Sequence, residues 1–281
     1  MSGSNTLVKL GTEYARANVL GAGIHAVDLT AATGLIEEAI AKRRKGYVCL
    51  TGVHGVMEAQ RDSRFCAILD RALLVAPDGM PTVWVGRAQG FRQMRRVYGP
   101  DLMLEICRRS AKKRTSHFLY GGNPGVAEKL KSNLEAWCPG ITIVGTYTPP
   151  FRPLSPDEQC EIEDRMARLC PDIVWVGMST PKQERFMADN IERFSCSVMI
   201  GVGAAFDIHT GNLKDAPYWI KQAGLQWLHR LSQEPSRLWK RYLVNNPAFL
   251  WRIIVQLAGL RSYELQISQP QIRDTDEVLI K

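Results

Sequence analysis

The sequence has little of what membrane-spanning, secreted or disulfide-rich proteins need. No run of about 18 or more apolar residues occurs, so we expect no helix that crosses a bilayer. The N-terminal sequence MSGSNTLVKLGTEYARANVLGAG has no basic segment followed by an apolar core, and we expect no secretory signal. The seven cysteines are scattered and include no CxxC pair, which favours a reducing cytoplasm over an oxidising compartment.

Two common nucleotide-binding motifs are also absent. Neither GxGxxG nor the P-loop GxxxxGKS/T occurs, so the sequence gives no direct support for a dinucleotide or for ATP. An ordinary NAD-dependent dehydrogenase is disfavoured for that reason. No internal repeat or low-complexity tract is found, and the composition, 45% hydrophobic and 23% charged, is that of a globular protein.

Short apolar runs alternate with helix-length segments over most of the chain. Helical patterns cover 101–114, 124–137, 156–170 and 182–194. The predicted strands are 47–51, 72–76, 117–121, 141–145, 172–177 and 198–202. Strands joined by crossover helices predict a doubly wound, mostly parallel, Rossmann-like α/β sheet over about residues 15–212.

Three of the predicted strands end in glycine-rich sequences. In doubly wound sheets ligands gather at the carboxyl ends of the strands, and glycine lets backbone N–H groups approach a phosphate. Each sequence alone is compatible with a tight turn, but three at one edge favour a phosphate or nucleotide site. The sequences are Gly121-Gly122-Asn123-Pro124-Gly125, Gly177-Met178-Ser179-Thr180-Pro181 and Gly201-Val202-Gly203.

Asp78 follows a predicted strand at the same edge, in the sequence LLVAPDGMPTVW (73–84). PDG is a common turn sequence, so a turn without catalytic function is one interpretation. The chain returns to apolar residues at once, however, and a carboxylate shielded by apolar walls has a raised pKa, as a general base needs. A catalytic aspartate is the other interpretation.

The formal charge of +8 is concentrated near the C-terminus. Between Lys214 and Arg261, eight Lys and Arg residues stand against two acidic residues, and aromatic and aliphatic residues are interleaved with them. This pattern is typical of a segment that binds an anionic membrane surface. The alternative is a helical segment whose apolar face packs on the α/β core. No nucleic-acid motif occurs, so we expect no nucleic-acid partner.

The order and spacing of several motifs resemble the WecG/TagA/CpsF family of bacterial glycosyltransferases. The resemblance covers about residues 45–243. The motifs are Thr51, PDGMP (77–81), RRVYGPD (95–101), GGNPG (121–125), PKQE (181–184), GVGAAFD (201–207) and WLHRLSQEPSRLWKRYL (227–243).

The resemblance implies an inverting transferase that moves N-acetylmannosamine or a related hexose from a UDP-sugar to a polyprenyl-diphosphate-linked glycolipid. Such enzymes build bacterial cell-wall polymers, capsule or exopolysaccharide. It implies a peripheral protein on the inner face of the cytoplasmic membrane, and a homo-oligomer is left open. A rival hypothesis is a non-catalytic nucleotide-sugar-binding protein that regulates polysaccharide assembly.

The resemblance also assigns roles to four residues. Asp78 would remove the proton from the acceptor hydroxyl, and Thr51 and Gln183 would line the sugar and acceptor pocket. Arg96 would contact substrate or the leaving diphosphate, since a guanidinium stays charged and binds phosphate in a bidentate way. Structural alternatives are a strand-end residue for Thr51, a solvated helix position for Gln183 and a surface ion pair for Arg96.

Cations of the C-terminal segment would fold over the active site and neutralise the departing UDP without a metal. Arg230 and Arg237 are seven residues apart, which places them on one helical face if the helix is continuous. If Pro235 interrupts the helix, they lie on consecutive helices. We expect no metal and no other cofactor. The residues that occupy this stretch are Arg230, Arg237, Lys240 and Arg241.

Three positions either depart from the family's motifs or allow two interpretations. The family often has asparagine at the position of Val53, and His54 follows it. His54 either takes the place of that asparagine in the pocket or packs as a strand-end histidine. Gln226 stands where the family's GLEW motif has a glutamate. Asp207 either orders a loop or contacts the nucleotide. The donor sugar therefore stays open.

The predicted division of the chain has three parts. An α/β core covers 1–212, and a basic amphipathic helical appendage, acting as active-site lid and membrane contact, covers 213–261. A polar tail covers 262–281, for which disorder is one interpretation. The DxD string, Asp274-Thr275-Asp276, lies in this tail and is not expected to bind a metal.

Overall fold

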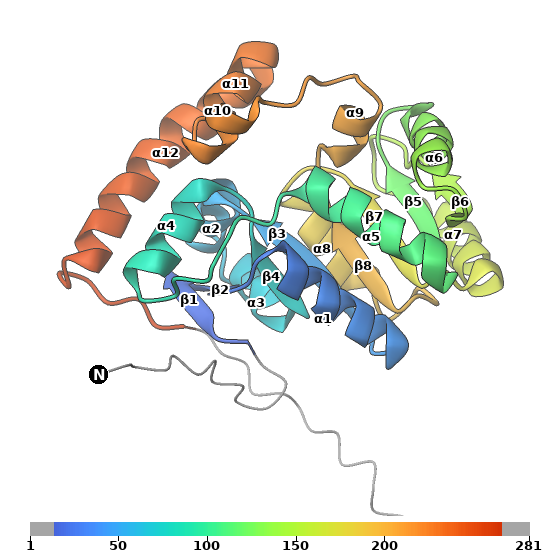
Figure 1. Ribbon diagram of the computed structural model, residues 1–281, viewed down its shortest axis with the longest axis horizontal. Helices are drawn as coiled ribbons and strands as arrows, with labels where there is room; N and C mark the ends of the chain where they lie inside the picture. Colours follow the sequence, from blue (N-terminus) through green and yellow to red (C-terminus); the bar gives the residue numbers. More distant parts are fainter. Residues whose placement is uncertain (1–13, 266–281) are drawn as a thin grey trace, which may run out of the picture.

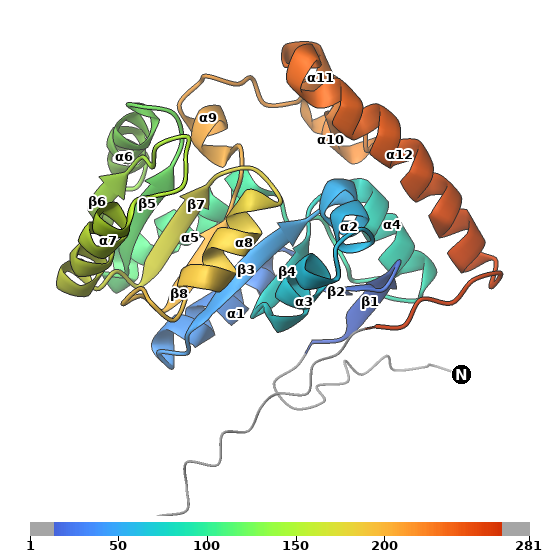
Figure 2. The same ribbon diagram turned by 180° about the vertical axis from the view of Figure 1, so that it is seen from behind.

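The structure is a computed structural model that describes residues 14–265 (Figures 1 and 2). Its centre is a six-stranded sheet in which all neighbouring strands are parallel, in the order β4-β3-β8-β7-β5-β6. This confirms the six predicted strands and the doubly wound, Rossmann-like architecture. The strands are β3 (Gly46–Thr51), β4 (Leu74–Pro77), β5 (Ser116–Gly121), β6 (Thr142–Tyr147), β7 (Ile173–Gly177) and β8 (Val198–Gly201).

Helices cover both faces of this sheet (Figures 1 and 2). Side chains alternate between the faces along each strand, so Cys49 packs into one core layer and Val48 and Leu50 into the other. Since both faces are covered, the strands are apolar almost throughout. The helices of the core are α1 (Leu29–Ala41), α2 (Val53–Ala59), α3 (Ser63–Arg71), α4 (Met80–Ala88), α5 (Gly99–Lys113), α6 (Val126–Trp137), α7 (Pro156–Leu169), α8 (Lys182–Asn190) and α9 (Ala205–His209).

A two-stranded antiparallel hairpin precedes the sheet and was not predicted from the sequence. It is formed by β1 (Arg16–Val19) and β2 (Ala22–His25). The turn residues Leu20 and Gly21 have φ values of 53° and 83°, as a tight two-residue hairpin turn requires. Leucine rarely adopts such a conformation, so the sequence carried no turn signal at this position.

The basic C-terminal segment forms three helices that lie above and beside the core (Figure 1). They are α10 (Tyr218–Gln222), α11 (Gln226–Gln233) and α12 (Pro235–Leu257). Proline fits the first turn of a helix, and Pro235 begins α12, so Arg230 and Arg237 lie on consecutive helices. Within the described chain no helix is long and apolar enough to cross a membrane.

The predicted boundary near residue 212 falls between α9, which ends at His209, and α10. The division into core and appendage remains a prediction. Tyr263, at the start of the predicted tail, contacts the hairpin: its carbonyl oxygen accepts a hydrogen bond from Asn18 Nδ2 at 2.6 Å. The DxD string at 274–276 lies outside the described residues.

Candidate active site

One large cleft runs along the carboxyl edge of the sheet and beneath the C-terminal helices. Its volume is about 1830 Å³, and its walls come from the ends of β3, β4, β5, β7 and β8 and from α4, α11 and α12. Thr51 and Lys240 lie outside the lining that the described residues form. The predicted residues that line it are Asp78, Arg96, Gln183, His54, Gly121, Gly122, Gly177, Gly201, Gly203, Asp207, Arg230, Arg237 and Arg241.

Asp78 occupies a tightly defined turn between β4 and α4. Its backbone N–H donates to the Thr51 carbonyl at 3.0 Å, which continues the hydrogen bonding of β3 with β4. A Cβ at Gly52 would lie 2.3 Å from the Asp78 carbonyl oxygen, so only glycine fits there. Gly79 has φ +116°, which also favours glycine. Thr51 therefore contributes to the site through the backbone position of Asp78.

The Asp78 carboxylate is enclosed by the cleft and faces a cation. A third of the side chain is accessible, and that third opens into the cleft. Arg96 Nη2 lies 3.4 Å from Oδ1. Burial raises the pKa of Asp78 above its ordinary value, and the charges of Arg96 and Arg230 oppose this only in part. A carboxylate of raised pKa that substrate can reach is suited to accept a proton.

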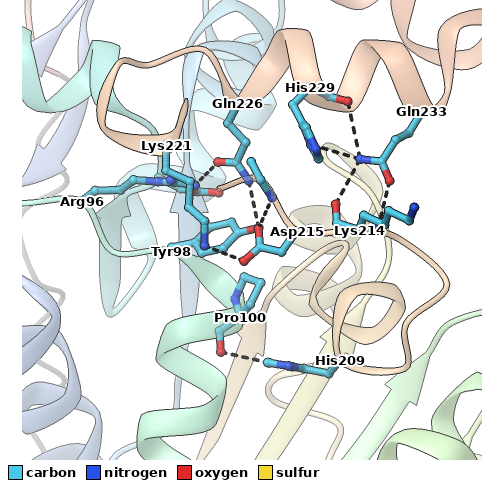
Figure 3. Close-up of polar contacts among 12 residues, drawn as sticks. Arg96, Tyr98, Pro100, His209, Lys214, Asp215, Lys221, Gln226, His229 and Gln233 are labelled. Atoms are coloured by element: carbon cyan, nitrogen blue, oxygen red, sulfur yellow. Dashed lines mark hydrogen bonds and ion pairs between the residues drawn. The ribbon is translucent and has the colours of Figure 1, made fainter. Parts of the chain in front are cut away.

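Arg96 is held in place by a polar network from the appendage (Figure 3). Its guanidinium lies over the Tyr98 ring, 4.1 Å from the centroid, and donates to Gln226 Oε1. Gln226 Nε2 donates to the Tyr98 hydroxyl at 2.8 Å, and that hydroxyl donates to Asp215 Oδ1 at 2.8 Å. Lys221 neutralises Asp215. The Arg96 side chain is 11% exposed, so the interpretation as a surface ion pair is wrong.

Gln183 lies in the first turn of α8 and is 3% exposed, so it is not a solvated helix residue. Its Oε1 accepts the Gly203 N–H at 3.0 Å, and its Nε2 donates to Glu184 Oε1 at 3.1 Å. The amide packs against Gly201, where a Cβ would lie 3.0 Å from Nε2. These contacts fix the orientation of the amide at the cleft wall.

Glu184 is a buried carboxyl group that the sequence analysis did not single out. Its Oε1 accepts from Thr180 Oγ1 at 2.8 Å as well as from Gln183. Its Oε2 is buried without a hydrogen-bond partner among residues 14–265. Burial raises the pKa of Glu184. Its position next to Gln183 in PKQE was the only signal available, and the helical pattern did not distinguish it from a surface glutamate.

His54 has both ring nitrogens engaged by the protein. Nδ1 accepts from Asn245 Nδ2 at 3.1 Å, which assigns the proton to Nε2, and Nε2 lies 3.2 Å from the Thr180 carbonyl oxygen. Burial lowers its pKa to about 4, so the ring is neutral near pH 7. Asn245 Oδ1 in turn accepts from Arg61 at 2.6 Å. His54 thus joins α2, the loop after β7 and α12, while also lining the cleft.

Three arginines of the appendage line the same cleft as Asp78. Arg230 and Arg237 both pair with Glu234, at 2.8 and 2.6 Å. Arg241 Nη2 donates to the Thr180 carbonyl at 3.1 Å. Lys240, the next residue on the helix, points its ammonium toward the Trp239 ring, 5.5 Å from the centroid. The arrangement places several fixed positive charges on one wall of the cleft.

Two of the cleft arginines carry a buried donor with no protein partner. Arg96 Nε and Arg230 Nε are both buried and unpaired among the described residues. Buried unpaired N–H groups are uncommon in folded proteins. Across residues 14–265, no group of three or more His, Cys, Asp or Glu side chains is arranged to hold a metal ion.

The three glycine-rich loops lie together at the floor of the cleft, as predicted. The Gly122 N–H donates to the Gly177 carbonyl at 3.0 Å, which joins the loops after β5 and β7. The loop after β8 is joined to them through Gln183 and Gly203. Asp207 lines the cleft and its Oδ1 lies 3.5 Å from Asn212 Nδ2, so both interpretations of Asp207 stay open. A nucleotide-binding role for the loops also remains a prediction.

Comparison with known proteins identifies a family and close relatives. The family described as "Glycosyl transferase WecG/TagA/CpsF family" matches residues 17–263. A Bacillus spizizenii protein named N-acetylglucosaminyldiphosphoundecaprenol N-acetyl-beta-D-mannosaminyltransferase is 30% identical over 217 residues, 77% of this chain and 82% of the relative. A Bacillus subtilis protein of the same name is 32% identical over 185 residues, 66% of this chain and 70% of the relative.

Proposed function

Because the chain belongs to the WecG/TagA/CpsF family and is a glycosyltransferase, we propose that it transfers a sugar from a UDP-sugar to a polyprenyl-diphosphate-linked glycolipid. The names of the two relatives describe addition of N-acetylmannosamine to N-acetylglucosaminyldiphosphoundecaprenol. N-acetylmannosamine or a related hexose is the donor sugar that we propose. The observation that carries the proposal is the enclosed Asp78 carboxylate, which shares one cleft with arginines of the appendage.

Asp78 is the general base in this proposal. As the acceptor hydroxyl oxygen attacks the anomeric carbon, its proton passes to the Asp78 carboxylate. The new C–O bond forms while the bond from the anomeric carbon to the UDP oxygen breaks, so a single displacement inverts the anomeric centre. Burial raises the pKa of Asp78, which makes the carboxylate a stronger proton acceptor than an exposed aspartate.

Fixed cations offset the charge on the departing UDP. Arg96 and Arg230 each hold a buried Nε–H without a partner within the described chain, and both line the cleft. The guanidinium groups of both side chains line the cleft, and preorganised charges of this kind stabilise a leaving diphosphate without reorganisation. Arg237 and Arg241 extend the positive wall. On this basis we propose catalysis without a metal ion.

The glycine-rich loops are the proposed nucleotide site. Gly121, Gly177 and Gly201 end three neighbouring strands at the cleft floor. Backbone N–H groups at such strand exits approach phosphate and ribose closely because no side chain intervenes. Gln183, whose amide orientation is fixed by Gly203 and Glu184, lies beside them and is suited to hold a sugar hydroxyl.

The outer surface of the appendage supports contact with an anionic membrane at the inner face of the cytoplasmic membrane. Trp239, Leu243 and Trp251 of α12 are 47%, 58% and 68% exposed. Lys240 lies among them and outside the cleft lining of the described residues. Exposed aromatic and aliphatic side chains beside cations are typical of helices that lie in the headgroup region of a bilayer.

UDP release from a panel of UDP-sugars tests the proposal, with a polyprenyl-diphosphate-GlcNAc analogue present or absent and EDTA in the buffer. We expect acceptor-dependent release from one donor, unaffected by EDTA and lost in Asp78→Asn, while UDP affinity is kept. Binding of UDP without release from any donor would instead favour the nucleotide-sugar-binding protein. Loss of activity in EDTA would overturn the metal-independent mechanism.

A further inference from the structure

The cleft does not end at the catalytic groups but continues between α4 and α12. We call this extension the α4–α12 groove. Val85, Phe249 and Ile253 are buried and form its floor, while Trp84, Leu250 and Ile254 are 47%, 60% and 52% exposed and form its rims. The residues that line the groove are Trp84, Val85 and Ala88 of α4, and Phe249, Leu250, Ile253, Ile254 and Leu257 of α12.

The wall formed by α12 changes from cationic to apolar along its length. Arg237 and Arg241 line the cleft first, then Asn245 and Asn246, and then the groove residues from Phe249 onward. These positions recur at three- and four-residue spacing, so they belong to one face of the helix. Within the described lining, no charged residue of α12 lies beyond Arg241.

Both ends of the groove are structurally defined. Near the catalytic groups, the Trp84 ring packs against Gly224, where a Cβ would lie 2.7 Å from Cη2. At the far end, Gln89 Nε2 after α4 and Gln256 Nε2 of α12 both donate to the carbonyl of Asn18, at 2.6 and 2.9 Å. The hairpin thus holds the two helices at a fixed separation, so the groove is part of the folded structure.

We propose that the α4–α12 groove binds the first isoprene units of the lipid acceptor. This inference rests on the proposed function. An acceptor that joins a sugar diphosphate to a hydrocarbon chain changes from anionic to apolar along its length, and the cleft changes in the same order from Asp78 and the arginines to the groove. The distance from Phe249 to Leu257 is about 12 Å along the helix, so only the first few units of a long chain fit.

The groove is distinct from the membrane-facing surface of the same helix. Leu243, Val244 and Trp251 are 58%, 56% and 68% exposed, and they lie outside the cleft lining of the described residues. Helix α12 therefore presents two apolar faces, one toward α4 and one away from it. The outer face contacts the bilayer, and the groove takes the chain of a single acceptor molecule.

Acceptors with tails of one, two or three isoprene units on GlcNAc-diphosphate test this proposal without a membrane. We expect the acceptor KM of the wild type to fall by about tenfold for each added unit and then to level off, because each unit buries further methylene groups. The groove variant Leu257→Gln should make the acceptor KM less dependent on the number of isoprene units. The matched outer-face variant Leu243→Gln should keep that dependence and lose vesicle binding instead.

Leu257 and Leu243 are suited to this comparison because they are 49% and 58% exposed on the same helix. Thermal unfolding serves as the folding control, and the midpoint of both variants should stay close to that of the wild type. A KM that does not depend on tail length overturns the proposal. So does an equal loss of this dependence in Leu243→Gln, which would assign the effect to the outer face.

Photo-cross-linking separates failure of the groove from failure of the proposed function. The probe is GlcNAc-diphosphate with a benzophenone on a two-isoprene tail, mapped by mass spectrometry on the full chain. We expect saturable labelling within 84–88 and 249–257, competed by the unlabelled acceptor. Such labelling without transfer would keep the groove and reject the proposed transfer from a UDP-sugar, whereas labelling of 239–244, between two copies of the chain, or nowhere would reject the groove.

Discussion

The rim of the sheet and the C-terminal appendage contribute to one cleft, but they are held in different ways. At the rim, the Asp78 N–H and the Gln183 Oε1 are both bonded to backbone groups of neighbouring strand exits. In the appendage, no residue of α10 or α11 is buried within the described chain. Helix α12, although 23 residues long, buries only Leu238, Asn245, Phe249 and Ile253.

Side-chain hydrogen bonds hold the appendage to the loops that carry the site. Gln226 contacts Arg96, Arg241 contacts Thr180, and Asn245 contacts His54. Gln233 also bonds the backbone of Lys214, which fixes α11 to the segment before α10 (Figure 3). A layer with few buried apolar contacts opens at lower free energy than the core. The turn that holds Asp78 is therefore formed with the sheet, whereas Arg230, Arg237 and Arg241 reach the cleft only when these helices pack on the core.

Removal of the rim carboxylate should have the largest effect. We expect Asp78→Asn to lower kcat by about 10³-fold, because the acceptor proton then has no base, while UDP affinity changes little. Asp164→Asn is the matched control, since Asp164 is an exposed acidic residue on α7, and it should change kcat by less than about twofold. Steady-state kinetics and UDP titration check both. Loss of UDP binding in Asp78→Asn would contradict the assigned role.

Removal of an appendage cation should have the next largest effect. We expect Arg230→Ala to lower kcat/KM for the donor by about 10²-fold, since a fixed positive charge at the cleft wall is lost. Glu234 keeps Arg237 as a partner, so the helix should stay folded. Lys240→Ala removes a cation outside the described cleft lining and should be nearly neutral with a water-soluble acceptor. Equal losses in the two variants would show that only net charge matters.

A negative charge introduced where α11 contacts Arg96 should shift the pH profile of kcat. Gln226→Glu places a carboxylate beside Arg96 and offsets part of its positive charge. Arg96 then stabilises the ionised form of Asp78 less, so the pKa of Asp78 rises further. Since the base must be deprotonated, the acidic limb of the kcat profile should move to higher pH, so the loss of kcat should be larger at acidic pH than at about pH 8. Gln226→Ala removes the contact without adding charge. A rate loss independent of pH in Gln226→Glu would contradict this account.

The smallest effect should be that of His54 protonation on the stability of the folded protein. The pKa of His54 is about 4 in the folded protein and about 6.5 unfolded, so between these values the unfolded chain binds more protons. Stability should therefore fall as the pH decreases through this window, by about 1 kcal/mol from His54 between pH 7 and 5.5. Denaturant unfolding at the two pH values measures it. His54→Gln should remove that share of the dependence, and an unchanged dependence would count against a buried neutral ring.

The parts of the site that follow from local sequence were predictable. Apolar runs identified all six strands of the sheet, and glycine-rich exits identified the loops that meet at the cleft. The directions of the Arg241 and Lys240 side chains were not predictable. Arg241 turns toward the core and Lys240 does not, and this depends on how α12 packs against the core. The Gln226 contacts join residues 128 and 130 positions apart, and no local pattern encodes such a pair.

Thr51 lies at the strand exit predicted from the sequence, but it contacts Asp78 through its backbone and not through its side chain. The sequence placed it at a strand exit near the substrates, yet its side chain is buried and its carbonyl bonds the Asp78 N–H. The hairpin was missed because each strand has only four residues and the turn contains a leucine with positive φ. Sequence pattern reports residue types along the chain, whereas backbone contacts of this kind depend on the folded arrangement.

The carbonyl of Asn18 joins the beginning of the described chain to its end. It accepts from Gln256, a residue synthesised more than two hundred positions later. An unfinished chain on the ribosome can therefore form the sheet and its aspartate before the groove exists. Because α12 forms one wall of the α4–α12 groove, the groove is completed only after this helix has left the ribosome.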